Sequence, residues 1–430
     1  MLRRILLLNQ LGLLLFAACS DSQVAAQGKK PSQVLRQVIE HQQKMSETLS
    51  RGAGADNAQP PDLAELEELD EAVKKFAAER VAGFKLSDWK GEEWYSLALL
   101  YQVSEQFAPA AEAFRAYLNS DGKVKMMPNA QIGLGRALIE MERIEEAEKL
   151  LENMELSFIE GPVITAARAG LHKDLAVALR DRGSHEQAAE LAKKGYTLAD
   201  NSIALLRGAA PALRETTERN RIVLAALAVA SYERVGRKKE AGDLNDLVMK
   251  FDFDGRPELR AVYELELAGA RLIGAPAPEL EVSRWIERKL GPPWSLSQLR
   301  GKVVLLDFWA MWCGPCVAAF PRLREFQSKY ADKGLEVIGV TRFYGRSDAE
   351  ESLSREQEWK SLQSYKAKHK LTYPFAVGKM DDVTNEERYG VVGLPAIILI
   401  DRRGNVRHVK RGVGEYRKLE KQIEKLIGEK

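Results

Sequence analysis

Two cysteines three positions apart, Cys313 and Cys316, are the residues in this sequence whose type and spacing could carry chemistry. Such a pair can form and break a disulfide, and its thiolate form is the attacking species. Gly314 and Pro315 stand between them. The first lacks a side chain and the second lacks an N–H, which leaves the turn open to a docking substrate. The pair therefore predicts thiol–disulfide exchange.

The residues around the pair predict a strand, a turn and a helix. The apolar run 303–309 is typical of a buried central strand, and 317–330 has the pattern of a helix. Cys313 would then lie exposed at the helix N-terminus, where backbone N–H groups and the helix dipole favour a thiolate. Cys316 would lie one turn deeper and could resolve a mixed disulfide. This order of elements is the context in which a cysteine pair is redox-active.

Two other uses of the cysteine pair can be weighed against redox chemistry. A structural disulfide that closes so small a loop would constrain the unfolded chain little. A zinc site needs about four ligands, and the sequence has no second pair of this spacing and only scattered histidines. We therefore expect a redox pair, with no metal and no other cofactor.

A resemblance to a known family extends beyond the cysteines. The segment Asp307-Phe-Trp-Ala-Met-Trp-Cys-Gly-Pro-Cys316 resembles thioredoxin, and Pro321 matches the helix-kinking proline of that family. Residues 391–401 resemble its cis-proline strand, and the stretch 340–373 is similar to the exported TlpA/ResA-type branch. The resemblance implies a thioredoxin-fold α/β/α domain over residues 275–430.

This resemblance also implies a role for each matching position. Cys313 is the nucleophile, Cys316 is the resolving thiol, and Asp307 is a buried carboxylate that accepts the Cys316 proton. Burial should raise the pKa of Asp307. Pro395 is the cis residue, and the backbone of Leu394 beside it can pair with an extended substrate.

Other residues near the motif are expected to shape substrate access. Trp312 beside the first cysteine would form part of the docking surface with Gly314 and Pro315, whereas Trp309 would lie in the core. Residues 352–370 predict an inserted amphipathic helix, which either shapes access or simply covers the domain. The peroxiredoxin family is disfavoured because its Pro-x-x-x-Thr-x-x-Cys signature is absent.

Residues 62–272 show apolar spacings of three and four with almost no strand signal. A spacing that resembles the tetratricopeptide pattern of antiparallel helix pairs recurs at irregular intervals. These residues need be no more than the core of a helical solenoid, and the concave surface of such a fold could bind a protein partner. The best copy of the spacing comprises Trp94, Leu97, Ala98, Tyr101, Ala110 and Phe114.

The N-terminus has the features of an export signal. Two arginines precede a mostly apolar stretch to Ala18, which as a helix would span about 21 Å, too short for the ~30 Å hydrocarbon core. Residues 1–18 are therefore expected to be a signal peptide, followed by a tether with one helix over 19–61. The residues before Cys19 resemble the lipobox of bacterial lipoproteins, which implies lipidation of Cys19. Cleavage after Ala26 is the alternative, and either route exports the chain.

The composition is that of folded, soluble material, with 45% hydrophobic and 29% charged residues. A formal net charge of +2 gives no electrostatic case for nucleic-acid binding. We expect an exported periplasmic or cell-envelope oxidoreductase, anchored in the membrane by lipid, that reduces protein disulfides and takes electrons from a membrane thiol donor. Apocytochrome c thiols are one possible target. The competing hypothesis is a protein-binding helical scaffold with an accessory redox domain.

Overall fold

A computed structural model describes most of the chain, namely residues 30–52, 63–120, 126–155, 161–206, 211–251, 257–287, 295–380, 382–412, 414 and 416–429. The predicted signal peptide and Cys19 lie outside these residues. The chain divides into two compact units, Met1–Tyr263 and Glu264–Lys430. No helix in the described ranges is long and apolar enough to span a bilayer.

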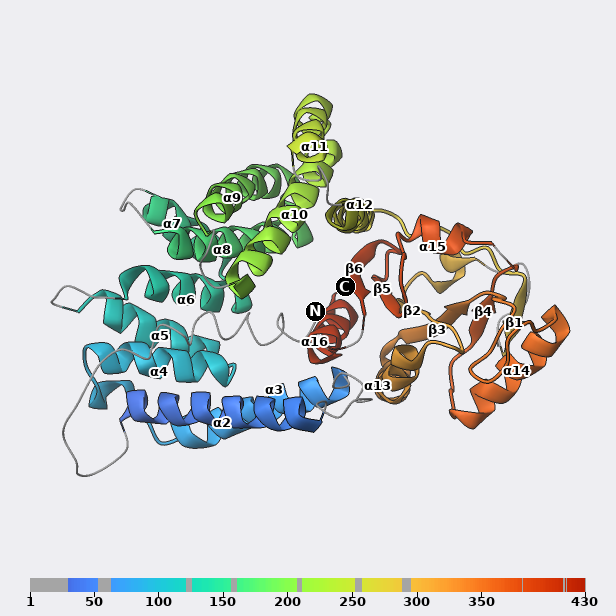
Figure 1. Ribbon diagram of the computed structural model, residues 1–430, viewed down its shortest axis with the longest axis horizontal. Helices are drawn as coiled ribbons and strands as arrows, with labels where there is room; N and C mark the ends of the chain where they lie inside the picture. The colour runs from blue at the N-terminus through green and yellow to red at the C-terminus, as the bar shows by residue number, and fades with distance from the viewer. Residues whose placement is uncertain are drawn as a thin grey trace. The chain divides into compact units, whose positions relative to one another are not determined.

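The first unit is built of helices that run in pairs (Figure 1). Its paired helices carry buried alanine, leucine and tyrosine on the faces that meet, as the three-and-four spacing predicts. They are α2 Pro31–Gly52, α3 Leu63–Val81, α4 Glu92–Val103, α5 Phe107–Leu118, α6 Met127–Glu140, α7 Ile144–Glu155, α8 Pro162–Asp181, α9 His185–Leu205, α10 Pro211–Arg234 and α11 Lys238–Phe251, with a short 3₁₀ turn at Leu86–Asp88.

Four of these pairs are joined by the same three-residue turn, although the repeat length in the sequence varies. Each turn has one residue with positive φ: Glu105, Glu142, Gly183 or Gly236. The next residue donates its backbone N–H to a carbonyl five residues earlier, which closes the end of the preceding helix. The pairs α4–α5, α6–α7, α8–α9 and α10–α11 are thus structural repeats.

Helix α2 belongs to the core of the first unit. Val34, Leu35 and Val38 are buried in the same apolar cluster as residues of α4 and α5, and α2 packs against α3 and α4. The sequence placed this helix in a tether. The structure instead makes it the outer layer of the helical stack, because its apolar face finds a partner far along the chain.

The second unit is a mixed sheet with helices on both faces. Helix α12 (Pro257–Leu272) enters it, and Arg411 donates a hydrogen bond to the Leu265 carbonyl at 2.8 Å. The remaining elements are β1 Arg284–Ile286, β2 Val303–Phe308, α13 Gly314–Tyr330, β3 Leu335–Thr341, α14 Arg355–Lys368, β4 Phe375–Val377, α15 Thr384–Arg388, β5 Ala396–Ile400, β6 Val406–Arg411 and α16 Tyr416–Gly428, with 3₁₀ turns at Leu296–Leu299 and Ala331–Lys333.

The strand order β1-β4-β3-β2-β5-β6 places β2 inside the sheet. β2 runs parallel to β3 and antiparallel to β5, and all six of its residues are buried. One core cluster joins α13, α14 and α16 to one face of the sheet, and a second covers the other face with residues such as Leu299 and Tyr389. The predicted fold class is confirmed: a helical region is followed by a thioredoxin-like mixed-sheet domain.

Candidate active site

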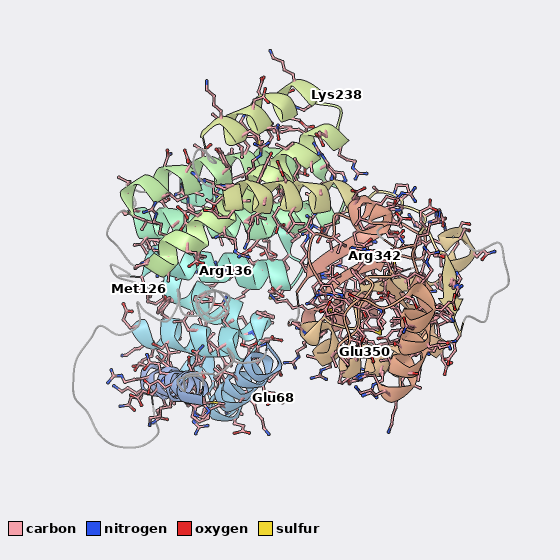
Figure 2. All side chains as sticks on the ribbon, turned by 45° about the vertical axis from the view of Figure 1, so that its right-hand side comes forward. Glu68, Met126, Arg136, Lys238, Arg342 and Glu350 are labelled. Atoms are coloured by element: carbon pink, nitrogen blue, oxygen red, sulfur yellow. A yellow bond between two sulfur atoms is a disulfide. The ribbon has the colours of Figure 1, made fainter. Side chains whose placement is uncertain are left out.

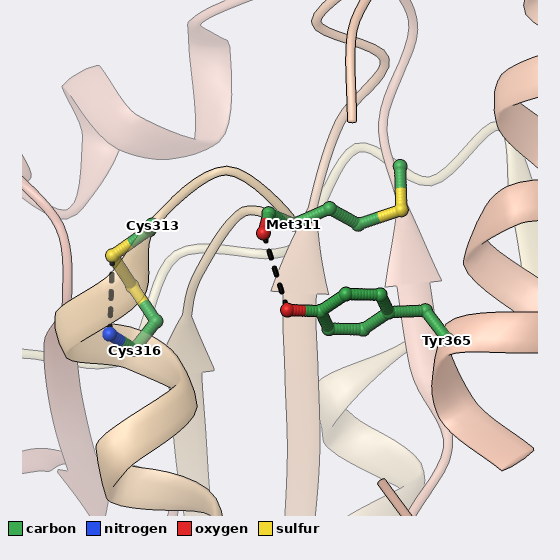
Figure 3. Close-up of a disulfide and its surroundings, with 4 residues drawn as sticks. All are labelled: Met311, Cys313, Cys316 and Tyr365. Carbon is green, nitrogen blue, oxygen red and sulfur yellow. Dashed lines mark hydrogen bonds between the residues drawn. A yellow bond between two sulfur atoms is a disulfide. The ribbon is translucent and has the colours of Figure 1, made fainter. Parts of the chain in front are cut away.

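The two motif cysteines form a disulfide at the start of α13. Their sulfurs are 1.97 Å apart and their Cα atoms 5.3 Å apart. Cys313 caps the helix, and the backbone N–H of Cys316 is shared between the Cys313 carbonyl oxygen at 3.0 Å and the Cys313 Sγ at 3.2 Å (Figure 3). The first N–H groups of a helix have no partner within the helix, and the helix dipole places partial positive charge there. The fold therefore holds the Cys313 sulfur where negative charge is favoured.

Cys313 is buried, contrary to the expectation that it would be exposed. Only 4% of its surface is accessible, and 1% of that of Cys316. The disulfide turns the first sulfur toward its partner, and both cysteines pack in the same cluster as Ala310 and Met311. The exposed residues at this point are the two between the cysteines, Gly314 and Pro315. In the oxidised form, access to the sulfurs is therefore confined to the turn itself.

The two tryptophans near the motif lie in different environments. Trp309 is fully buried, as expected, whereas Trp312 is 36% exposed beside Cys313. Tyr344 meets the Trp312 ring edge-on, with centroids 5.4 Å apart, and the Arg346 guanidinium lies 4.2 Å from its centroid. Trp312 thus offers a partly open aromatic surface next to the cysteine.

Asp307 is buried in the interior of the sheet near the end of β2. Its side chain is 1% exposed, and neither carboxylate oxygen has a hydrogen-bond partner in the described part of the chain. Burial raises the pKa of Asp307 to about 8, against a smaller opposing effect of the positive charge on Lys410. Pairing through Ile397 places Lys410 two strands away, roughly 10 Å at the usual strand spacing, which explains why its effect is the smaller one.

The Leu394–Pro395 peptide bond is cis, as the family resemblance implied. The pairing of Phe308 with Ala396 puts Pro395 opposite the end of β2, from which the motif loop departs. Pro395 is buried and Leu394 is half-buried against the cluster that contains both cysteines. The topology therefore brings the 394–395 segment to the same end of the sheet as the disulfide.

The predicted inserted helix is present as α14, with Leu362 and Tyr365 buried. Sequence reasoning missed the hydrogen bonds that side chains of α14 form with the backbone around the motif. The Tyr365 hydroxyl donates to the Met311 carbonyl at 3.2 Å, and Glu358 accepts the N–H groups of Tyr344 and Gly345, both at 2.9 Å. Burial raises the pKa of Glu358, and these two bonds oppose that effect.

The loop before α14 carries further polar contacts. Arg342, labelled in Figure 2, pairs with Glu386 at 3.0 Å, and its guanidinium lies 4.2 Å from the centroid of the Tyr344 ring. No signal in the sequence pointed to the pairing with Glu386, because that residue comes from a distant segment. Within the ranges that the structure describes, no three His, Cys, Asp or Glu side chains gather closely enough to hold a metal ion.

A cysteine pair at a helix N-terminus, a buried carboxyl near the end of the central strand β2 and a cis-proline segment at the same end of the mixed sheet define a thioredoxin-fold protein of thiol–disulfide exchange. Residues 273–409 match the AhpC/TSA family model. The chain is 30% identical over 154 residues to thiol-disulfide oxidoreductase ResA of Bacillus thuringiensis subsp. konkukian (strain 97-27), which covers 36% of this chain and 78% of that protein. The chain belongs to this family of thiol–disulfide oxidoreductases.

Two further similarities cover an equal share of the chain. Protein DipZ of Mycobacterium tuberculosis (strain CDC 1551 / Oshkosh) is 33% identical over 155 residues, 36% of this chain and 21% of that protein. A thiol-disulfide isomerase from Corynebacterium glutamicum has a solved structure with 26% identity and a TM-score of 0.31, covering 36% of this chain and 98% of that one.

Proposed function

We propose that this protein is an exported reductant of protein disulfides, with Cys313 as the nucleophile and Cys316 as the resolving thiol. The observation that carries the proposal is the position of the Cys313 sulfur at the N-terminus of α13, where it accepts the Cys316 N–H at 3.2 Å. An N–H directed at the sulfur stabilises a thiolate and lowers its pKa below the value of about 8.5 for free cysteine. Family membership supports the reaction class.

The reaction proceeds in two exchanges. The Cys313 thiolate attacks one sulfur of the substrate disulfide, and the other substrate sulfur leaves as a thiolate. The Cys316 thiolate then attacks the Cys313 sulfur and releases the second substrate thiolate. Both substrate thiolates take protons from water. The substrate has gained two electrons, and the protein is left with the Cys313–Cys316 disulfide.

Asp307 is proposed to accept the proton that Cys316 loses before the second exchange. A carboxyl with a pKa of about 8 can take up and release a proton close to neutral pH. At pH 7 about one tenth of such a group is ionised. The second exchange is therefore expected to accelerate as the pH rises toward 8.

The substrate is proposed to bind across the exposed turn. Trp312, Gly314 and Pro315 are exposed next to the cysteines in sequence, and the segment Leu394–Pro395 lies at the same end of the sheet. An extended substrate strand would pair with the backbone of Leu394, beside a proline that has no N–H of its own.

Direction, location and electron supply are further parts of the proposal. The sequence Cys-Gly-Pro-Cys is that of thioredoxin, whose couple of about −270 mV is reducing, and this favours a reductant. The features of residues 1–19 favour export and lipid anchoring through Cys19 in the periplasm or cell envelope. A membrane dithiol donor would then restore the reduced pair, and we include apocytochrome c thiols among the proposed targets.

A second candidate function belongs to the helical region. Its four helix pairs with matching turns and its tetratricopeptide-like spacing favour a surface for a protein partner. In this alternative the helical scaffold does the main work, and the redox domain is an accessory.

Trapping separates these alternatives. Cys316→Ser leaves the first exchange intact but blocks release, so it should accumulate mixed disulfides on Cys313, identified by mass spectrometry under non-reducing conditions. Cys313→Ser is the matched control and should trap nothing. If the variant with both cysteines changed recovers the same partners in the same amounts, the scaffold is favoured and the disulfide-reductase proposal is wrong.

A further inference from the structure

Helix α14 contacts the motif loop although it forms no part of the sheet. It connects β3 to β4, and its Tyr365 hydroxyl donates to the carbonyl of Met311, two residues before Cys313 (Figure 3). Tyr365 is 5% exposed and Met311 is 3% exposed, so water competes little for this hydrogen bond. Burial raises the pKa of Tyr365 to about 12, and the hydroxyl therefore keeps its proton at neutral pH.

The ring that carries this hydroxyl is held on several sides. It stacks on Trp309, with centroids 5.7 Å apart and planes at 22°. The His369 ring lies 4.4 Å away and that of Phe320 6.4 Å away, measured between centroids. Because the ring cannot shift without moving core residues, the hydroxyl is a fixed point from which the Met311 carbonyl is oriented.

The same helix holds the other side of the loop. Glu358 accepts the backbone N–H groups of Tyr344 and Gly345, and the Tyr344 ring meets Trp312 at 5.4 Å. Helix α14 thus restrains the two residues before Cys313: Met311 directly through Tyr365, and Trp312 indirectly through Tyr344.

We propose that Tyr365 is a positioning residue for the nucleophile: its hydroxyl orients the Met311 carbonyl and so keeps the Cys313 sulfur within hydrogen-bond distance of the Cys316 N–H at the start of α13. This inference rests on the proposed role of Cys313. A carbonyl oxygen carries partial negative charge. Once released from the tyrosine, it could rotate toward the sulfur and disfavour a thiolate. A less restrained loop would also allow the sulfur to move away from the Cys316 N–H. The hydrogen bond between them would then weaken, because its strength falls with distance and misalignment.

Other charged groups around the loop remain in place when only the hydroxyl is removed. Arg346 lies over the Trp312 ring, Arg342 pairs with Glu386, and Asp307 is buried at the end of β2. None of them is hydrogen-bonded to Tyr365 or Met311 in the described residues. The charged and titratable groups that face Tyr365 itself also stay: Lys368, with its Nζ 5.7 Å from the ring centroid, His369 and Asp348. A change in Cys313 reactivity would therefore report the loop and not a lost charge.

The test compares Tyr365→Phe with Tyr389→Phe in the full chain. Tyr389 is the matched control, because its buried hydroxyl also donates to a backbone carbonyl, that of Pro278, on the other face of the sheet. For each reduced protein we would titrate the thiolate absorbance and measure the rate constant with neutral 2-hydroxyethyl disulfide. Chemical unfolding of each oxidised protein records stability.

Tyr365→Phe should raise the Cys313 pKa by about half a unit to one unit. Below that pKa the thiolate population, and with it the rate, would fall roughly three- to tenfold. Tyr389→Phe should leave the Cys313 pKa and the rate unchanged, although each variant loses one buried hydrogen bond to a backbone carbonyl. If the Cys313 pKa and rate constant are unchanged in Tyr365→Phe, or change equally in both variants, this inference is wrong but the proposed function stands. A Cys313 thiol that titrates like free cysteine in the unaltered protein would overturn the proposed function as well.

Discussion

Three buried polar side chains of the helical unit differ from one buried carboxyl of the sheet unit in how their hydrogen bonds are satisfied. In the helices, the buried His172, Ser202 and Thr217 each bond to a carbonyl one turn earlier in their own helix. In the sheet, Asp307 is buried with no hydrogen-bond partner for either oxygen among the described residues. The first arrangement costs little, because the polar group is satisfied locally. The second is unfavourable for an ionised carboxyl, which is consistent with the role in proton transfer that we propose for Asp307.

The largest expected effect of a single change concerns the cysteines of the sheet unit. Cys313→Ser and Cys316→Ser should each lower the rate of insulin disulfide reduction by at least roughly a thousandfold, since each removes one of two obligatory sulfurs. The unfolding midpoints of the reduced proteins should stay close to that of the reduced unaltered chain. Residual turnover above a hundredth in either variant would mean that the pair does not act as one unit.

The buried carboxyl should make stability depend on pH. Its pKa is raised from 3.8 to about 8 in the folded chain, so its contribution is most favourable below about pH 4. As the pH rises toward 8, the unfolded chain ionises first and stability falls by up to about 1.4 kcal/mol per unit. Asp307→Asn lacks this titration.

The measurement is denaturant unfolding of both oxidised proteins between pH 4 and 9. Relative to the unaltered chain, Asp307→Asn should gain stability steadily from pH 4 to 8 and then level off. A difference that does not change with pH would show that Asp307 titrates at an ordinary value.

Asp307 should also matter for rate. Asp307→Asn cannot accept the Cys316 proton, and loss of a general base lowers a rate by about a hundredfold. Single-turnover mixing of a preformed mixed disulfide at pH 7 would isolate the second exchange. The first attack by Cys313 should change much less, and equal slowing of both exchanges would argue against a proton-acceptor role.

The helical unit should respond only in stability. A Cβ on Gly133 would meet the Phe114 ring at 2.3 Å, so Gly133→Ala should destabilise the unit by roughly 1–3 kcal/mol. Gly242→Ala is the matched control: nothing lies within 4 Å of its added Cβ, and it should stabilise helix α11 by about 0.5–1 kcal/mol. Unfolding followed by circular dichroism measures both, and insulin reduction should be unaltered. If Gly133→Ala loses turnover under conditions where it is fully folded, the helical unit contributes to disulfide reduction.

Local features of this fold could be predicted from the sequence. The continuous apolar run indicated β2, and the helical spacing indicated the paired helices, because each pattern reflects which face is buried. The match to thioredoxin implied the burial of Asp307 and the cis bond before Pro395. Such features depend on neighbours in sequence or on a family pattern.

Contacts between distant segments could not be predicted. Periodicity placed Tyr365 inward but could not say that its hydroxyl would find Met311. The buried Glu358 looked like any charged residue of an exposed helix face, because its partners are backbone N–H groups of another loop. The prediction that Cys313 is exposed was wrong for a related reason. Its burial depends on how the disulfide-bonded residue packs against core residues, which the sequence does not show.

Iodoacetamide alkylation of the reduced chain, followed against pH with the modified residue located by mass spectrometry, tests whether Cys313 is the activated nucleophile. We expect Cys313 to be labelled first, with a midpoint at about pH 7, and Cys316 to react far more slowly. Labelling of Cys316 first, or a Cys313 midpoint near the value of about 8.5 for free cysteine, would contradict it.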